Sequence, residues 1–78
     1  MREKEMRVVI TFKNTSAAMA MEKFCKEEGA GGRLIPVPRE ITSGCGLAWS
    51  AAPDTKEDLI NLLGKHDIKY ENIYELEI

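Results

Sequence analysis

Apolar and polar side chains alternate near the start of the chain and then change to a helical spacing. Residues 6–12 (Met-Arg-Val-Val-Ile-Thr-Phe) alternate with period two and are rich in β-branched side chains, which predicts a half-buried strand. Residues 14–16 (Asn-Thr-Ser) interrupt this pattern and offer side chains for a helix N-cap. From Ala17 onward the apolar residues recur every three or four positions, so we expect a helix that ends at Gly29 and the glycines after it. The apolar face of this helix consists of Ala17, Ala20, Met21, Phe24 and Cys25.

The middle of the chain predicts two short strands joined by a loop. Residues 34–37 form the first of them, and because Pro36 and Pro38 lack a backbone N–H, this strand should lie at an edge of the sheet. The loop spans residues 38–44, and residues 45–51 predict a third strand of small side chains. The pattern does not decide which face of the third strand meets the helices. One face carries Gly46, Ala48 and Ser50, and the other carries Cys45, Leu47, Trp49 and Ala51.

The last third of the chain predicts a second helix and a fourth strand. Pro53 and Asp54 open the helix, with Asp54 as the N-cap and Glu57 three residues later, in the spacing of a capping box. Alternation of apolar and acidic residues over residues 74–78 predicts the last strand. The apolar stripe of the helix is formed by Leu59, Ile60, Leu62 and Leu63.

The predicted order of elements is therefore β-α-β-β-α-β. This order is typical of the ferredoxin-like split βαβ arrangement, an α+β fold in which a four-stranded antiparallel sheet carries both helices on one face. We expect a single domain over residues 6–78, preceded by a flexible charged arm at residues 1–5.

Composition and charge narrow the classes of function. The chain has 78 residues and a net charge of −2, which argues against nucleic acid as a partner because phosphate binding needs a cationic surplus. No apolar run approaches the ~20 residues of a membrane span, and the charged start lacks the pattern of a signal peptide. We therefore expect a cytoplasmic protein without a membrane partner, whose two cysteines are reduced. A chain this short has a thin core, so pairing with a second copy as a homodimer would add stability.

The most distinctive residue is Cys45, which lies between Gly44 and Gly46. Flanking glycines free the backbone and give little side-chain cover, so the thiol should be accessible. A cysteine becomes reactive where a positive environment favours the thiolate, and Arg33 and Arg39 could supply that charge. These features make Cys45 a candidate nucleophile.

The predicted topology brings Cys45 close to the start of the first helix. The first two strands run parallel, so the loop after the second strand lies at the end of the sheet where the first helix begins. The free N–H groups of that helix, near Thr15 and Ser16, carry a positive partial charge that favours an anion. Because the second helix runs back toward this end, Lys65 and His66 are further candidates for a positive environment.

Simpler interpretations remain open. The Gly-Cys-Gly segment also fits a tight turn around a small apolar residue, because free cysteine often packs as a hydrophobe. Cys25 lies about 13–14 Å along the first helix, too far for a disulfide with Cys45, which requires Cα atoms within ~7 Å. His66 is the one histidine, and with Cys45 alone it does not make a metal site, so we expect neither a metal nor a cofactor.

Residues 32–48 (Gly-Arg-Leu-Ile-Pro-Val-Pro-Arg-Glu-Ile-Thr-Ser-Gly-Cys-Gly-Leu-Ala) resemble the hallmark of a family of small bacterial proteins, the selenium/sulfur carrier protein-like family. The Pro-Val-Pro-Arg stretch followed by Ser-Gly-Cys-Gly is specific, and the similarity extends over nearly the whole chain. The resemblance implies that Cys45 is the functional cysteine. Trp49 stands where a smaller aliphatic residue would be expected.

These observations lead to one hypothesis and two alternatives. In the hypothesis, Cys45 carries sulfur or selenium as a persulfide or selenosulfide between a donor, such as a cysteine desulfurase, and an acceptor protein. Such a chain is a carrier rather than a stand-alone enzyme. In the first alternative the loop of residues 38–44 binds a small anion or a partner and Cys45 is structural, although the loop lacks the glycine-lysine pattern of a P-loop. In the second, the chain is a dimerising accessory subunit that uses the open face of its sheet.

The expected site combines Cys45 with the thiolate-stabilising residues Arg33, Arg39, Thr15 and Ser16 and the loop residues Pro36, Pro38, Ser43, Gly44 and Gly46.

Overall fold

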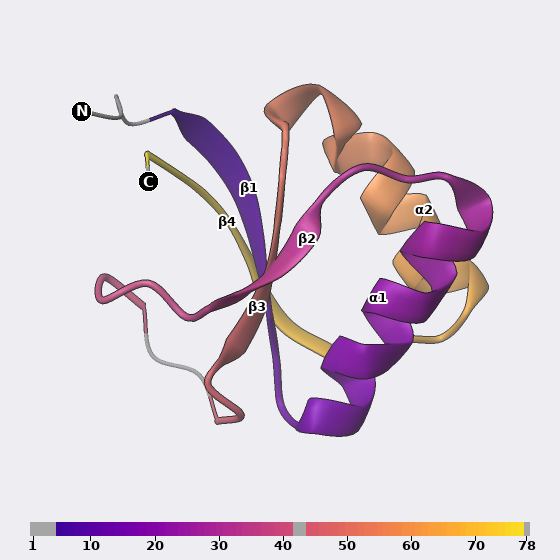
Figure 1. Cartoon of the computed structure of the whole chain (residues 1–78), viewed down its shortest axis with the longest axis horizontal. Helices are drawn as coiled ribbons and strands as arrows, with labels where there is room; N and C mark the ends of the chain where they lie inside the picture. Colours follow the sequence, from indigo (N-terminus) through magenta and orange to yellow (C-terminus); the bar gives the residue numbers. More distant parts are fainter. Residues whose placement is uncertain (1–4, 42–43, 78) are drawn as a thin grey trace.

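The computed structural model describes residues 5–41 and 44–77 of the chain and has the predicted element order. One antiparallel sheet of four strands carries two helices, as expected for a ferredoxin-like α+β fold (Figure 1). Residues 1–4 of the expected arm and Ile78 lie outside the described residues. The elements are β1 (Met6–Phe12), α1 (Thr15–Glu28), β2 (Arg33–Pro36), β3 (Leu47–Ala51), α2 (Lys56–Lys65) and β4 (Tyr70–Glu77).

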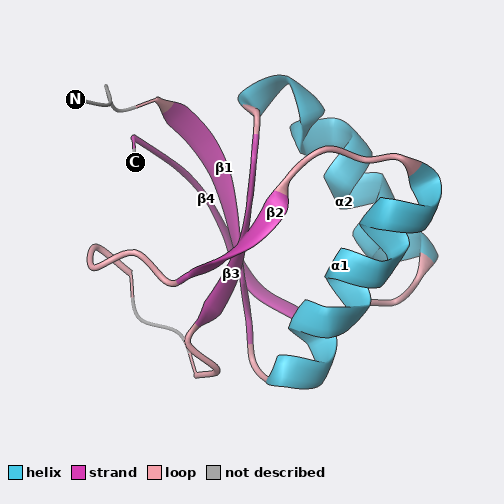
Figure 2. Cartoon of the chain, viewed as in Figure 1, coloured by secondary structure: helices cyan, strands magenta, loops and turns pink. Residues whose placement is uncertain are grey.

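The sheet has the strand order β2-β3-β1-β4, so the central strands are β3 and β1. β1 pairs with β3 from Val8 opposite Ala51 to Thr11 opposite Ala48, and with β4 over its whole length. Figure 2 shows that both helices lie on the same side of this twisted sheet, as predicted. The edge position of β2 is also confirmed. β2 pairs with its neighbour β3 as far as Pro36. Because Pro36 and Pro38 lack a backbone N–H, the regular ladder of hydrogen bonds between the two strands stops there.

The hydrophobic core lies between the helices and one face of the sheet. Trp49 and Ala51 belong to this core, and Cys45 and Leu47 pack against it, so this face of β3 is the one that meets the helices. The structure thereby decides the facing that the period-two pattern left open. From the other elements the core takes Val8, Ile10, Phe12, Ala17, Ala18, Met21, Cys25, Leu59, Leu62, Leu63 and Ile68.

The other face of the sheet carries no helix (Figure 2), yet its centre is buried. Val9, Thr11 and Ala48 have no exposed surface, and Ser50 is nearly as well covered. The side chains of these central residues are short. Arg7 reaches one of them, because its Nε donates a hydrogen bond to Ser50 Oγ at 3.1 Å.

The ends of the helices agree with the sequence in one case and differ in the other. Asn14 caps α1, and its Oδ1 accepts a hydrogen bond from the Ala17 N–H at 2.9 Å. The capping box predicted at Asp54 is wrong: residues Pro53–Thr55 form a 3-10 turn, and Thr55 precedes α2 without a side-chain cap. The proline fits the first position of this tighter turn, and the N-cap of α2 moves one residue along the chain, from Asp54 to Thr55.

One residue of α2 and the starts of two strands also differ from the prediction. Ile60 belongs to the predicted apolar stripe of α2 but is 42% exposed. β3 begins at Leu47 rather than at Cys45, and β4 begins at Tyr70 rather than at residue 74, because pairing with β1 extends it through a polar stretch. Within the described residues no helix is both long and apolar enough to cross a membrane.

Candidate functional site

Cys45 lies in the short bend that leads into β3. The last hydrogen bond at the base of the β2–β3 loop runs from the Val37 N–H to the Gly46 carbonyl oxygen at 3.0 Å. Gly44, on the other side of Cys45, lies against the end of β1, because a Cβ added there would be 3.2 Å from the carbonyl oxygen of Lys13. Lys13 immediately precedes the N-cap of α1. Cys45 is therefore at the end of the sheet where α1 begins, in agreement with the predicted topology.

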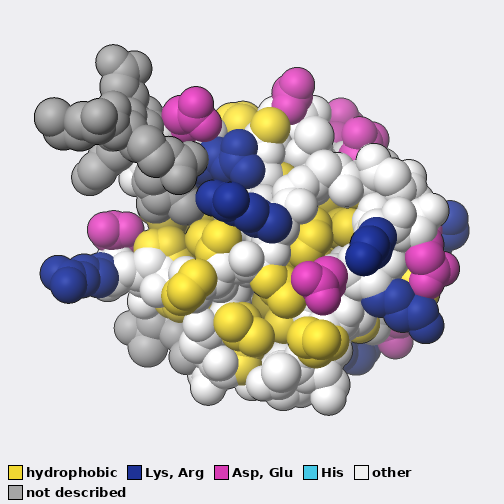
Figure 3. All heavy atoms as spheres, viewed as in Figure 1, with side chains coloured by type: hydrophobic (Ala, Val, Ile, Leu, Met, Phe, Trp, Pro, Cys, Tyr) yellow, Lys and Arg dark blue, Asp and Glu magenta, His cyan; other side chains and the backbone are white. Residues whose placement is uncertain are grey.

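The surroundings of the Cys45 side chain are apolar. The residue is half-buried, packs against the hydrophobic core and donates a hydrogen bond from Sγ to the Leu47 carbonyl oxygen at 3.6 Å. Partly buried residues of β2 and β3, including Leu34 and Leu47, pack against the same core. Figure 3 shows apolar side chains reaching the surface in the middle of the face seen there, between groups of charged side chains. The thiol thus lies at the margin of the core and is less exposed than its flanking glycines suggested.

The two glycines beside Cys45 have different structural roles. Gly46 has φ 75°, in the left-handed region that favours glycine. Gly44 has an ordinary φ but lies against Lys13, so a larger residue would push the bend away from β1. Both glycines therefore help to fix the position of Cys45 between them.

The start of α1 provides backbone N–H groups at this end of the sheet. Thr15 and Ser16 are the first two residues of α1, and both are exposed. One donor of the first turn, the Ala17 N–H, is already used by the Asn14 cap. The position of the helix start relative to Cys45 is as expected, while a role of Thr15 and Ser16 at the thiol stays a proposal.

Arg33 does not lie beside Cys45. It is the first residue of β2 and pairs with Ser50, whereas Cys45 precedes Leu47, the partner of Pro36 at the other end of the strand. Pro36 lies three positions after Arg33 along the strand, a distance of about 10 Å at 3.3 Å per residue. The sequence placed the two residues in one distinctive stretch, but the extended strand between them holds them apart. We therefore leave Arg33 out of the proposed site.

Arg39 lies closer along the chain, in an exposed turn of the β2–β3 loop. The Ile41 N–H closes this turn by donating to the Pro38 carbonyl oxygen at 3.0 Å. Figure 1 shows this part of the loop projecting away from the helices. Ser43, which the sequence also assigned to the site, lies outside the described residues. A contribution of Arg39 to the charge around Cys45 stays a proposal.

Lys65 and His66 are far from Cys45, at the C-terminal end of α1. His66 Nε2 donates to Glu28 Oε2, and Lys65 Nζ lies 3.2 Å from the same oxygen. The His66 ring also stacks on Phe24, with ring centroids 3.8 Å apart. Because Glu28 ends the 14-residue α1, this cluster is about 20 Å from the start of that helix. The expectation that Lys65 and His66 lie near the thiol is wrong, because the two helices meet at their C-terminal ends.

The cluster at Glu28 could not be recognised from the sequence. Hydrogen bonds from His66 and then from Lys65 lower the pKa of the Glu28 carboxyl below its usual value. Residues 28 and 66 are far apart in the chain, and the only available signal was the general preference for cations near a helix C-terminus. We interpret the cluster as a link between the two helices.

Cys25 has the surroundings of a packing residue, as predicted. It has no exposed surface, and burial together with the nearby charge of Glu28 raises the pKa of its thiol from 9.0 to about 11. Both cysteines are free. Within residues 5–41 and 44–77, no group of three or more His, Cys, Asp or Glu side chains is arranged to hold a metal ion.

Comparison with known proteins matches the chain to a family. The model of the family described as "Putative Se/S carrier protein-like" matches residues 7–75, which include every element from β1 to most of β4. No curated protein and no solved structure matches the chain.

Proposed function

Because the chain belongs to the Se/S carrier protein-like family, we propose that Cys45 holds one atom of sulfur or selenium for transfer between the thiols of two partner proteins. The observation that supports this proposal is the contrast between the two cysteines. Cys45 is half-buried in a bend at the end of the sheet, whereas Cys25 is fully buried and kept protonated. A carrier needs an accessible thiol, and Cys45 is the better candidate.

The proposed exchange is balanced without a further reactant. The Cys45 thiolate attacks the outer sulfur of a persulfide on the donor. The bond between the two donor sulfurs breaks, its electron pair leaves with the donor thiolate, and a new S–S bond forms on Cys45. The thiolate of the acceptor then attacks the outer sulfur of the Cys45 persulfide and releases the Cys45 thiolate. Selenium would follow the same course as a selenosulfide. Each step replaces one bond between chalcogen atoms by another, so no oxidant or reductant is consumed.

Three nearby features would assist Cys45 in this proposal. Arg39 and the backbone N–H groups at Thr15 and Ser16 would favour the thiolate, and Gly44 and Gly46 would hold it at the surface. The exchange would take place in the cytoplasm, where free thiols stay reduced, between a donor such as a cysteine desulfurase and an acceptor protein. The chain would then act as a carrier and not as a stand-alone enzyme.

The experiment is to load the protein and locate the added atom. The purified chain is incubated with a cysteine desulfurase and cysteine, or with selenocysteine, and its intact mass is measured before and after dithiothreitol. We expect one added sulfur or selenium atom on Cys45 that dithiothreitol removes. Cys25→Ala should load to the same extent as the wild type, whereas Cys45→Ser should not load.

A parallel reaction with an established carrier shows that the desulfurase is active. If the carrier is loaded in the same mixture while Cys45 stays unmodified, sulfur transfer through this residue is contradicted. Loading of Cys25 in the folded protein would contradict the assignment of the site.

A further inference from the structure

Arg33, which lies too far from Cys45 to belong to its site, faces a buried serine on the helix-free face of the sheet. Ser50 on β3 lies opposite Arg33 on β2 and opposite Val9 on β1, and it is 3% exposed. Residues opposite each other in an antiparallel pair point to the same face, with Cβ atoms about 4.5–5.5 Å apart. Arg7 reaches Ser50 from β1, because its Nε donates a hydrogen bond to Ser50 Oγ at 3.1 Å. Two arginines, from the strands on either side of β3, therefore flank one hydroxyl group.

Neither arginine pairs with a carboxylate in the described part of the chain. All ion pairs among residues 5–41 and 44–77 use lysine or His66 as the cation. Arg33 is exposed and Arg7 is partly exposed. Arginine keeps its charge at physiological pH, so the two side chains repel each other across β3. Their remaining N–H groups are available to an anion, and an anion bound there would offset the repulsion.

The register of the sheet separates its charges. Glu75 and Glu77 lie opposite Val8 and Met6, so both carboxylates are on the helix-facing side of β4, where Glu75 pairs with Lys56 at 3.7 Å. The paired positions on the helix-free face contain no aspartate or glutamate; they are Arg7, Val9, Thr11, Arg33, Ile35, Ala48, Ser50, Asn72, Tyr74 and Leu76. This face is therefore cationic, although the net charge of the chain is −2.

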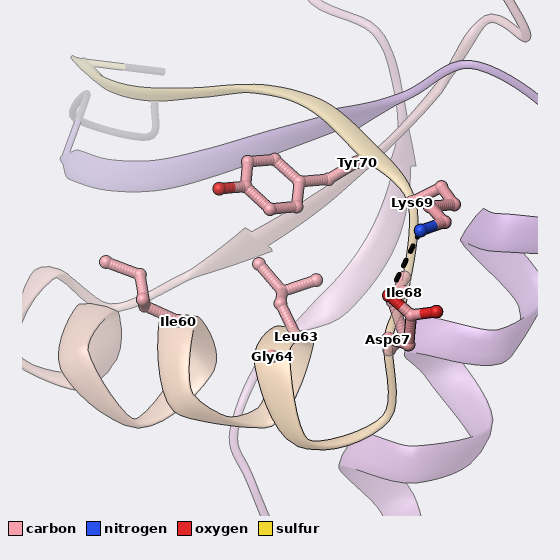
Figure 4. A pocket seen from close by; sticks show the side chains of 7 residues that line it. All are labelled: Ile60, Leu63, Gly64, Asp67, Ile68, Lys69 and Tyr70. Atoms are coloured by element: carbon pink, nitrogen blue, oxygen red, sulfur yellow. Dashed lines mark hydrogen bonds and ion pairs between the residues drawn. The ribbon is translucent and has the colours of Figure 1, made fainter.

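The helix-facing side of β4 is unsuited to an acidic ligand. An apolar groove of about 410 Å³ lies there between α2 and β4, and Ile60 and Leu63 point across it toward the ring of Tyr70 (Figure 4). Its neighbours on the same side of β4 are Glu75 and Glu77. Carboxylates beside an apolar groove repel an acidic segment, so such a segment favours the opposite face of the sheet.

The side chains around the two arginines resemble those of a protein-binding surface. Ile35, Tyr74 and Leu76 are partly exposed on the same face, and Leu76 lies opposite Arg7. Arginine and tyrosine are enriched where proteins bind one another. Single-stranded nucleic acid stacks successive bases on several aromatic rings, and Tyr74 is the one aromatic residue among the paired positions of this face. A protein partner therefore fits the face better than a nucleic acid.

From these observations we infer that the helix-free face of the sheet docks an acidic segment of a partner protein, whose carboxylates bind Arg7 and Arg33 on either side of Ser50. The planar guanidinium group matches a carboxylate with two parallel hydrogen bonds. Ser50 occupies the Nε of Arg7, which holds that side chain in place and leaves its terminal N–H groups for the ligand.

A second copy of the chain does not supply this ligand through the same face. A twofold interface brings identical surfaces together, and the helix-free face offers arginines without carboxylates at its paired positions. The surface is also separate from Cys45, which packs against the core on the helix-facing side. Docking at Arg7 and Arg33 therefore goes beyond the thiol exchange and does not depend on it.

The test uses a capped synthetic peptide of about eight alternating glutamate and leucine residues, a length that spans the sheet. The control peptide has glutamine in place of every glutamate, so shape is kept and charge is removed. Backbone amide signals and the arginine Nε–H signals of the folded protein are followed by NMR during each titration. We expect signals around Arg7, Arg33 and Ser50 to shift with the glutamate peptide alone, and binding to weaken as salt is added.

Four variants test the two arginines. Arg7→Gln and Arg33→Gln should each weaken binding of the glutamate peptide by about fivefold. Lys26→Gln removes the same charge from an exposed position on α1 and should leave binding within about twofold. Arg7→Lys keeps the charge but loses the hydrogen bond from Nε and the planar fork, so it should still weaken binding by about threefold. Arg33→Gln changes an exposed residue and remains informative if a change at Arg7 disturbs the fold.

Three results would overturn docking at this face. They are equal binding of the two peptides, equal weakening by Arg33→Gln and Lys26→Gln, and no binding at about 1 mM peptide. Two further titrations test the occupant, one with an oligothymidylate of the same charge and one with inorganic phosphate. Tighter binding of either than of the peptide, at the same salt concentration, would show that the partner is a nucleic acid or a small anion and that our assignment of the occupant is wrong.

Discussion

Trp49 and Gly32 depend on each other although 17 positions separate them. Trp49 lies in the core with 3% of its surface exposed, and the backbone of Gly32 lies close to its indole ring. A Cβ at Gly32 would be 2.4 Å from Trp49 Nε1 and 2.8 Å from the Ser50 carbonyl oxygen. Gly32 also has φ 120°. The glycine run after α1 therefore has two functions: Gly29 ends the helix in the left-handed conformation, and Gly32 makes room for the tryptophan.

Gly32→Ala should lower the free energy of unfolding by roughly 1–3 kcal/mol, since it adds both a steric overlap and an unfavourable φ. Gly31→Ala is the matched control, because a Cβ at Gly31 meets no atom within 4 Å and its φ is not positive. It should leave stability unchanged within about 0.5 kcal/mol. Urea unfolding followed by tryptophan fluorescence measures both. Equal effects of the two substitutions would contradict the role of Gly32.

At the scale of elements, the two helices are joined at their C-terminal ends by polar contacts. Glu28 on α1 accepts from His66, just after α2, and pairs with Lys65. The stack of His66 on Phe24 adds an apolar contact between the same two segments. These bonds favour the charged form of Glu28, so its folded pKa is lower than its unfolded pKa. Their contribution to stability is present above the unfolded pKa and is lost as the pH falls through the folded pKa.

The stability difference between the wild type and Glu28→Gln should therefore shrink as the pH is lowered through the acidic range. His66→Phe keeps a ring against Phe24 but removes the main hydrogen-bond donor, so it should move the pKa of Glu28 back toward its ordinary value. Side-chain carboxyl NMR shifts give this pKa directly in both proteins. An identical titration of Glu28 in the wild type and His66→Phe would show that the hydrogen bond does not lower the pKa.

The whole molecule has a single core with a titratable group inside it. Cys25 packs there with Met21 and the apolar face of β1. Burial raises the pKa of its thiol to about 11, so the folded protein holds this proton over a range in which the unfolded chain has lost it. The unfolded state then binds fewer protons, and stability falls as the pH rises.

Global stability should be unaffected by this group below the ordinary thiol pKa of 9.0 and should decline between there and the folded pKa near 11. A shift of about two pKa units limits the loss of stability to roughly 3 kcal/mol, and the actual loss should be of that order or smaller. Cys25→Ala removes the thiol, so its stability should depend less on pH over this range, whatever its loss of packing. Urea unfolding at several alkaline pH values provides the comparison. Parallel pH curves for the two proteins would contradict the assignment.

The sequence by itself determined the elements and their order. The period-two pattern of residues 6–12 coincides with β1, Gly29 ends α1, and Pro36 marks the edge strand. These features are local, because side-chain period, missing donors and left-handed glycine depend on the nearest residues. The motif around Cys45 indicated the family, and the order of elements indicated the end of the sheet where the cysteine lies.

The tertiary structure alone decided which of these residues meet. Period two defines two faces of β3 but not the one that helices cover, and the helical period of α2 does not reveal that Ile60 faces an open groove. Arg33 and Cys45 look like neighbours in the sequence, yet the strand between them holds them apart. Lys65 and His66 bind Glu28 because the helices converge at their C-terminal ends. Such contacts depend on the angle at which packed elements cross, and that angle results from the fit of the whole core.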